Sequence, residues 1–264
     1  VFKNQVQSIG NKDNKINFLK SEKDPWGVVA LVGKETKGSI FEHTNLSGGS
    51  GGYFGGYEFT GMFSIHSSED INLSNVSISN NAKYDDLIHI LYSSGIKLSD
   101  SIIFDAKMDA IDIDISEMEI NNCKFDNSGN DAIDAMTSKV KILNSYINKT
   151  GDKGLSAGEN SEVSVTNLTF DKTEIAIQSK DGTYISVNNS KFLNNKIQLD
   201  AYHKNWRYGN RAKIEVKDSL FESDNNLIKA EDKSEIMVSN SYFNKSFLHL
   251  KSNKINLEDN YVLD

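Results

Sequence analysis

The 264-residue sequence has one cysteine, one proline, no long apolar run and no excess of basic residues. The single thiol, Cys123, excludes an internal disulfide and fits no multi-thiolate metal site. The longest apolar runs, such as Trp26 to Gly33, are far shorter than the roughly 20 residues that a membrane-spanning helix needs. The net charge of −8 argues against nucleic acid as a partner, because phosphate contacts need clustered Lys and Arg. We therefore expect neither a membrane span nor nucleic-acid binding.

The composition does not change along the chain. Asn, Ser, Lys and Ile occur from end to end, and no linker rich in Ser and Pro separates two parts. This uniformity predicts one domain over residues 1–264, and we expect a monomer. Because the sequence begins within the repeating pattern, without a charged start and an apolar signal core, we expect it to be a fragment of a longer exported protein.

A repeat of about 22 residues dominates the sequence. Its template is apolar-x-apolar-x-Asn/Asp-x-x-apolar, and the three apolar positions hold in every copy. The polar position recurs nine times, at Asn75, Asp100, Asn122, Asn144, Asn167, Asn189, Asp218, Asn240 and Asp259. The intervals between these positions are 25, 22, 22, 23, 22, 29, 22 and 19 residues. His43 occupies what looks like an earlier position of the same column.

The alternation within each copy predicts short strands, and the absence of a 3.6-residue period excludes long helices. One copy cannot bury its apolar face alone, so copies must stack, and each strand must pair in parallel with its equivalent in the next copy. The sequence therefore predicts an all-β fold, a single-stranded right-handed parallel β-helix of about ten coils. Neighbouring coils would lie about 4.8 Å apart, with the Asn/Asp column as a hydrogen-bonded ladder.

With this pattern, the chain resembles the right-handed parallel β-helix of the pectate-lyase-like superfamily. Three segments, residues 151–159, 176–182 and 201–209, resemble β-helix domains of bacterial secreted or surface proteins, some of them attached to spore-coat-type kinases. The resemblance implies an extracellular or cell-surface location in a bacterium. It implies little about activity, because one fold hosts many functions.

Two outward-facing columns of residues suggest a site. If Ile65, Ile88, Ile111 and Ile133 are equivalent inward positions, the residues that follow them point outward and adjoin one another on successive coils. These are His66, His89, Asp112 and Asp134, continued by Ser156, Gln178 and Asp200. A second column precedes the inward positions and contains Asp86, Asp109, Asp131 and Lys153.

Such an acidic patch suits either a cation or acid–base chemistry. Calcium takes six to eight oxygen ligands with loose geometry, so we predict a calcium site at Asp86, Asp109 and Asp131. An imidazole beside a carboxylate suits proton transfer. The competing interpretation is that these Asp residues merely form tight turns, which Asp and Asn tolerate well.

The layout is similar to that of β-helix uronate lyases and epimerases. This resemblance implies that His89 or Lys153 is the base, that Asp112 and Asp134 are orienting or acid groups, and that His66 belongs to the same catalytic face. A glycoside hydrolase is the weaker alternative, because stacked Asp residues in any β-helix have the spacing of a retaining pair.

Two irregular segments interrupt the repeat. Residues 46–62 contain seven Gly, and are either a loop that carries Tyr53, Phe54 and Tyr57 over the acidic face or a flexible excursion between coils. The 29-residue interval contains a longer loop with side chains that suit an acidic saccharide. These predicted substrate-binding residues are Tyr202, His203, Trp206, Arg207 and Tyr208.

These observations favour an exported β-helix protein that binds or modifies an acidic polysaccharide or cell-surface glycan, with calcium as cofactor. The alternative is a non-catalytic surface, adhesion or structural module whose acidic residues are solvated turns.

Overall fold

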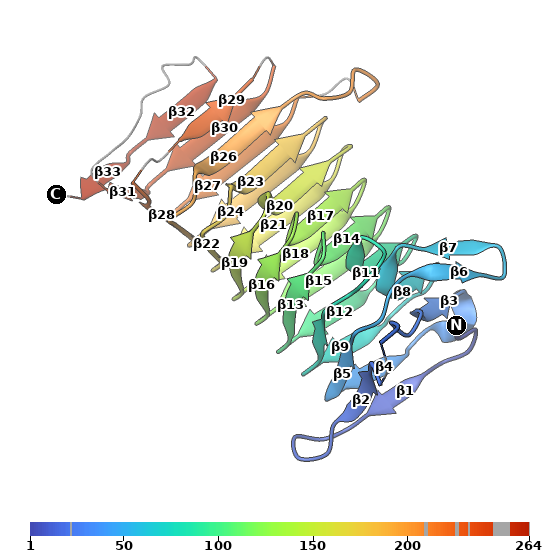
Figure 1. Ribbon diagram of the computed structural model, residues 1–264. Coiled ribbons are helices and arrows are strands. Elements are labelled where there is room, and N and C mark those ends of the chain that lie inside the picture. Colours follow the sequence, from blue (N-terminus) through green and yellow to red (C-terminus); the bar gives the residue numbers. More distant parts are fainter. Residues whose placement is uncertain (22, 209–210, 225–226, 232, 245–253, 264) are drawn as a thin grey trace.

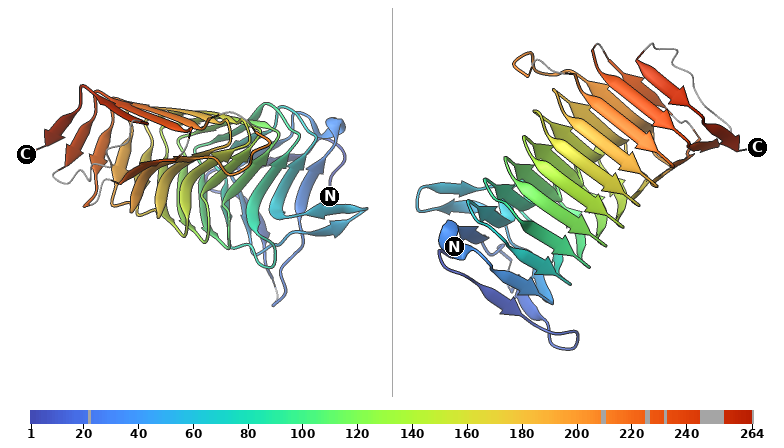
Figure 2. Two further views of the ribbon diagram at one scale, coloured as in Figure 1. Left: turned by 90° about the horizontal axis from the view of Figure 1, so that it is seen from above. Right: turned by 180° about the vertical axis from the view of Figure 1, so that it is seen from behind.

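The computed structural model describes residues 1–263 except 22, 209–210, 225–226, 232 and 245–253. Strands of three parallel sheets alternate along the chain, and together they wind into an elongated coil with the two termini at opposite ends (Figure 1). Figure 2 shows the same stacking from above and from behind. The predicted parallel β-helix is confirmed.

The first and second sheets have eleven strands each. The first sheet contains, in spatial order, β1 (Gln7–Ile9), β4 (Ile40–Glu42), β9 (Asn72–Ser74), β12 (Ile96–Ser99), β15 (Glu117–Asn121), β18 (Lys139–Leu143), β21 (Glu162–Thr166), β24 (Tyr184–Asn188), β27 (Lys213–Lys217), β30 (Glu235–Ser239) and β32 (Ile255–Glu258). The second contains β2 (Ile16–Leu19), β5 (Thr44–Ser47), β10 (Ser77–Ser79), β13 (Ile102–Ala106), β16 (Lys124–Ser128), β19 (Tyr146–Thr150), β22 (Thr169–Asp171), β25 (Lys191–Leu193), β28 (Leu220–Glu222), β31 (Tyr242–Asn244) and β33 (Tyr261–Leu263).

The third sheet has nine strands and carries the predicted site. It contains β3 (Val29–Val32), β8 (Gly61–His66), β11 (Asp86–Leu91), β14 (Ile111–Asp114), β17 (Ile133–Met136), β20 (Lys153–Gly158), β23 (Ile175–Lys180), β26 (Ile197–Tyr202) and β29 (Ile228–Ala230). One coil, for example β12, β13 and β14, contributes one strand to each sheet.

The Asn/Asp column forms the turn between the first and second sheets. All nine of its residues have a left-handed backbone with φ between 48 and 56°, and His43 has the same conformation at 47°. Asn and Asp tolerate this conformation better than other residues with a side chain. The predicted ladder is present, since Asn122 Nδ2 donates to Asp100 Oδ1 at 2.6 Å and Asn167 Nδ2 donates to Asn144 Oδ1 at 2.9 Å.

The interior is filled by columns of apolar side chains. Phe192 and Phe221 stack with ring centroids 4.5 Å apart, and Phe170 and Phe243 extend the stack at its two ends. Beside the ladder, buried hydroxyls accept a backbone N–H from the preceding coil, as when Cys123 N donates to Ser145 Oγ at 3.0 Å. These hydroxyls satisfy buried amides that the turns leave outside the sheets.

Two short elements depart from the coil. A 3-10 helix, η1 (Lys34–Thr36), follows β3. The glycine-rich segment forms an antiparallel hairpin of β6 (Gly52–Phe54) and β7 (Tyr57–Phe59), which extends away from the coil near its N-terminal end (Figure 1). Its Phe59 is buried, whereas Tyr53, Phe54 and Tyr57 are exposed. No helix in the described part of the chain is long and apolar enough to cross a membrane.

Candidate functional site

The outer face of the third sheet carries the predicted column. Parallel pairing places His89 beside Asp112 and Asp112 beside Asp134, and the column continues to Ser156, Gln178 and Asp200. Because side chains alternate between the two faces of a strand, Ile88, Ile111 and their equivalents fill the core while this column points outward. The prediction for this part of the column is confirmed.

The predicted position of His66 is wrong by two residues. β8 and β11 pair Ile65 with Ile90 and His66 with Leu91, so Ser64, and not His66, adjoins His89 in register. The first ladder interval is 25 residues, and adding 25 to Ile65 gives Ile90, so the sequence held the signal for the true register. His66 still contacts the site diagonally, with its Nε2 3.2 Å from His89 Nδ1.

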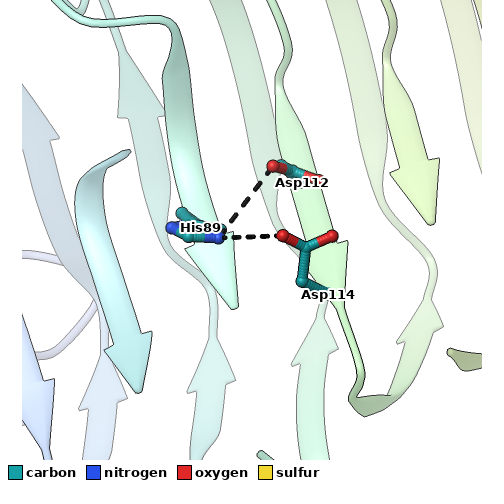
Figure 3. Close-up of side chains that lie close together, drawn as sticks. All are labelled: His89, Asp112 and Asp114. Atoms are coloured by element: carbon teal, nitrogen blue, oxygen red, sulfur yellow. Dashed lines mark ion pairs between the residues drawn. The ribbon is translucent and has the colours of Figure 1, made fainter. Parts of the chain in front are cut away.

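The side chains of His89, Asp112 and Asp114 converge (Figure 3). His89 Nε2 lies 3.9 Å from Asp112 Oδ2 and 3.5 Å from Asp114 Oδ2. Asp114 was not among the predicted site residues. It shares the face of Asp112 because it lies two residues further along the same strand, and this alternation could have identified it.

Burial makes this group unusual for an outer face. The side chain of His89 is 9% exposed, and those of Asp112 and Asp114 are 26% and 22% exposed. His66 is also buried, and its ring lies against that of Phe59 from the hairpin, with centroids 5.1 Å apart. The hairpin therefore covers one end of the group with a ring of β7.

The electrostatics follow from this burial. Burial first, and the carboxylates of Asp114 and Asp86 next, raise the pKa of Asp112 to about 9, because removal from water disfavours the charged form. Burial and the neighbouring His89 lower the pKa of His66 to about 4. At neutral pH, Asp112 is therefore protonated and His66 is neutral.

The second column has a structural role that does not depend on a left-handed turn, since Asp86, Asp109 and Asp131 all have negative φ. Asp109 and Asp131 lie two residues before the first residues of β14 and β17, where each accepts a backbone N–H from the next coil. Asp131 N donates to Asp109 Oδ1 at 2.8 Å, and Lys153 N donates to Asp131 Oδ1 at 2.9 Å. Burial raises the pKa of Asp86 to about 6, although a hydrogen bond from Thr60 and the charge of His89 oppose this rise.

Lys153 is bound by two carboxylates. Its Nζ lies 3.5 Å from Asp131 Oδ1 and forms a hydrogen bond with Asp152. Burial lowers the pKa of Lys153, but the contacts with Asp152 and Asp131 more than offset this effect and raise it. Lys153 is therefore protonated at neutral pH, which suits a cationic role and not that of a base.

The predicted substrate-binding residues lie away from the His89 group. β26 is five strands from β11, about 24 Å at the usual strand spacing. His203 Nδ1 lies 3.3 Å from the buried Asp181, which also accepts the N–H groups of Lys204 and Asn205. Beyond this anchor Trp206 is 80% exposed, and the Arg207 guanidinium lies 5.9 Å from its ring centroid.

Tyr202 and Tyr208 complete the predicted set. Tyr202 ends β26 and is half-buried, and Tyr208 N donates to Asn205 O within the loop. The loop could place an aromatic plane beside a ligand that lies along the sheet, but it does not form part of the His89 group.

A hollow of about 880 Å³ lies on a different side of the coil, along the ladder. Its walls include Asn122, Asn144 and Tyr146. The ladder amides there already hydrogen-bond to one another, so this hollow is a less suitable site than the outer face of the third sheet.

The fold and the repeat define the class of protein. Residues 60–243 match the family described as right handed beta helix region, and the chain belongs to this family. No curated protein matches the sequence significantly.

Solved structures share this fold at low sequence identity. PfbA, a surface adhesin of Streptococcus pneumoniae, is similar with a TM-score of 0.55 and 13% identity, over 98% of this chain and 75% of that one. The catalytic domain of a GH87 alpha-1,3-glucanase is similar with a TM-score of 0.52 and 12% identity, over 92% of this chain. The match spans 61% of that glucanase domain's length.

Proposed function

We propose that the chain is an extracellular protein that binds and modifies an acidic polysaccharide on the outer face of the third sheet, as a lyase or an epimerase. The observation that carries the proposal is the buried group of His89, Asp112 and Asp114 on a face that points away from the core. Burying ionisable groups is costly unless they are paired or neutralised. Strongly shifted pKa values in such groups are typical of functional sites.

An acidic polysaccharide would be repelled by this face unless positive charge lay between the two sets of carboxylates. Lys153 supplies one such charge, since its raised pKa keeps it protonated. A divalent cation supplies the rest. Calcium at Asp86, Asp109 and Asp131 remains a proposal, although Asp109 and Asp131 already use an oxygen to bind a backbone amide of the next coil.

Proton transfer is assigned to Asp134. This half-buried carboxylate adjoins Asp112 in register and makes no hydrogen bond with any described residue. The two bases predicted from the sequence fit less well, because Lys153 is protonated and because His89 Nε2 faces protein carboxylates. Asp134 would remove the C5 proton of a uronate, and a neighbouring acid would return a proton or assist the leaving oxygen.

The test is exchange of the C5 proton. Alginate, pectate and a glycosaminoglycan are incubated with the protein in D₂O, and deuterium at C5 is followed by NMR together with the ultraviolet absorbance of unsaturated ends. We expect exchange with one polymer, and a loss of at least about 100-fold in Asp134→Asn. Asp200→Asn, in the same column on β26, is the matched control and should retain the activity.

The rival proposal is a non-catalytic surface or adhesion module. It is favoured by the amide-binding role of Asp109 and Asp131, which explains one column without catalysis. Binding of a polymer without deuterium exchange would support this module. The absence of both binding and exchange across the three polymer classes would reject the polysaccharide function.

A further inference from the structure

We propose that His89 Nε2 and the carboxylates of Asp112 and Asp114 bind a first-row transition-metal ion, with Zn²⁺ as the preferred probe. The site differs in residues and in ligand chemistry from the calcium site predicted from the sequence. One atom from each of the three side chains lies within 4.8 Å of the others. They come from two adjacent strands, β11 and β14, whose register fixes their relative positions.

The distances fit a small cation. Zn²⁺ binds imidazole nitrogen and carboxylate oxygen at about 2.0–2.2 Å, so two tetrahedral ligands lie about 3.4 Å apart. His89 Nε2 lies 3.5 Å and 3.9 Å from the two carboxylate oxygens. A movement of Asp112 Oδ2 by about 0.5 Å toward His89 Nε2 would bring these two atoms to that separation. All three ligand atoms already lie within 4.8 Å of one another.

The buried nitrogen is a second and independent observation. His89 is 7% exposed, and its Nε2 makes no hydrogen bond with any described residue, although it is aimed between the two carboxylates (Figure 3). A buried polar atom without a hydrogen-bond partner is costly and rare. A metal ion at this point would give Nε2 a partner and would separate the two carboxylates with positive charge.

The other nitrogen of the ring is oriented as in known metal sites. A metal-binding His usually donates its second N–H to an outer-shell acceptor, which fixes the tautomer. His89 Nδ1 lies 3.0 Å from Thr60 Oγ1 and 3.2 Å from His66 Nε2. In the tautomer with the proton on Nδ1, either atom accepts a hydrogen bond from Nδ1–H, and the Nε2 lone pair is free for the metal.

The ligand set selects the kind of metal. Calcium and magnesium prefer oxygen, whereas imidazole suits Zn²⁺ and its first-row neighbours. Three protein ligands leave at least one coordination position open, as in catalytic zinc sites. Asp112 and Asp114 are each about a quarter exposed, so this position faces solvent and could accept a water molecule or a sugar oxygen.

The experiment measures metal binding by the protein alone, so its result does not depend on the polysaccharide function. The chain is stripped with a chelator and titrated with Zn²⁺, Ca²⁺ and Mg²⁺ by calorimetry, and Co²⁺ is added as a spectroscopic probe. We expect one equivalent of Zn²⁺ and Co²⁺, visible Co²⁺ bands of low coordination number, and much weaker binding of Ca²⁺ and Mg²⁺.

Variants test the ligands and the outer shell. His89→Gln, Asp112→Asn and Asp114→Asn should each weaken Zn²⁺ binding by more than about 100-fold, and Thr60→Val by about 10- to 100-fold. Asp200→Asn, an outward Asp of the same sheet, should bind as the wild type does. Circular dichroism confirms that each variant is folded.

The proposal would be overturned by Zn²⁺ binding that these substitutions leave unchanged, by calcium binding tighter than zinc binding, or by no Zn²⁺ binding at millimolar concentration. A Co²⁺ spectrum typical of six oxygen ligands would overturn it equally, because His89 would then lie outside the shell.

Discussion

Replacing Asp131 by Asn should stabilise the protein at pH 8, even though it removes a carboxylate that contacts Lys153. Asp131 is 2% exposed, and burial raises its pKa to about 7 while the attraction of Lys153 opposes this rise. Burial outweighs the attraction because Lys153 Nζ lies 3.5 Å away and already forms a hydrogen bond with Asp152. Asn keeps an acceptor for Lys153 N and carries no charge.

The direction and size of this change in stability follow from the linkage between proton binding and folding. The folded protein retains the Asp131 proton up to about pH 7, whereas the unfolded chain releases it near its ordinary pKa of 3.8. The stability from the raised pKa is thus fully present below pH 3.8 and is lost as the pH rises to 7. Each pH unit in this window costs about 1.4 kcal/mol. Between pH 5 and pH 8, the unfolding free energy of the wild type should fall by about 2–3 kcal/mol through this group, whereas that of Asp131→Asn should not.

The assay is urea unfolding followed by far-ultraviolet circular dichroism at both pH values, with a chelator present. The difference in unfolding free energy between Asp131→Asn and the wild type should grow in favour of the variant as the pH rises. Asp152→Asn is the control, because its exposed ion pair contributes about 0–1 kcal/mol. A variant that is less stable at pH 8 than at pH 5, relative to the wild type, would refute the reasoning and make the Lys153 pair the dominant interaction.

Further predictions concern the ladder, the aromatic stack and the thiol. Asn144→Ala should lower the unfolding free energy by about 2–3 kcal/mol, because it removes the hydrogen bonds with Asn121 and Asn167 and adds about 1–2 kcal/mol of left-handed backbone strain. Asn144→Gly should lower it less, and equal losses in urea unfolding would contradict the strain contribution. Phe192→Ala should lower the unfolding free energy by about 3–5 kcal/mol in the same assay, because Phe192 stacks between Phe170 and Phe221. A loss under about 1 kcal/mol would show that the stack collapses to fill the cavity. Burial raises the pKa of Cys123 to about 11, so this thiol should react with a thiol reagent at pH 8 only after unfolding. Rapid labelling of the folded protein would contradict its burial.

The repeat was sufficient to predict the fold and most of the outer columns. Nine ladder positions, read from Asn75 to Asp259, established the spacing of the coils, and the alternation within strands then placed His89, Asp112 and Asp134 side by side. Local spacing dictates these features, because parallel pairing in register leaves each residue only one neighbour on the next coil.

The position of His66, the role of Asp114 and the burial of Asp112 do not follow from a uniform 22-residue repeat. The predicted position of His66 is wrong by two residues because the coil of His66 is 25 residues from the next coil and not 22 or 23, a difference that the ladder interval from Asn75 to Asp100 already contains. Asp114 receives no role in the predicted site, because it belongs to neither of the two columns that the repeat defines. The burial that raises the pKa of Asp112 cannot be read from a pattern, since it arises from groups on several coils.

The stacked construction also has a consequence for how such a molecule can change over time. Each coil is bonded only to the one before and the one after, so duplicating a block of about 22 residues would lengthen the molecule by about 4.8 Å and preserve the chemistry elsewhere. Inserting a single residue within a strand would instead turn every later side chain of that strand to the opposite face. Deletions and duplications of whole blocks should therefore preserve the fold, provided that they do not separate the strand of His89 from that of Asp112 and Asp114.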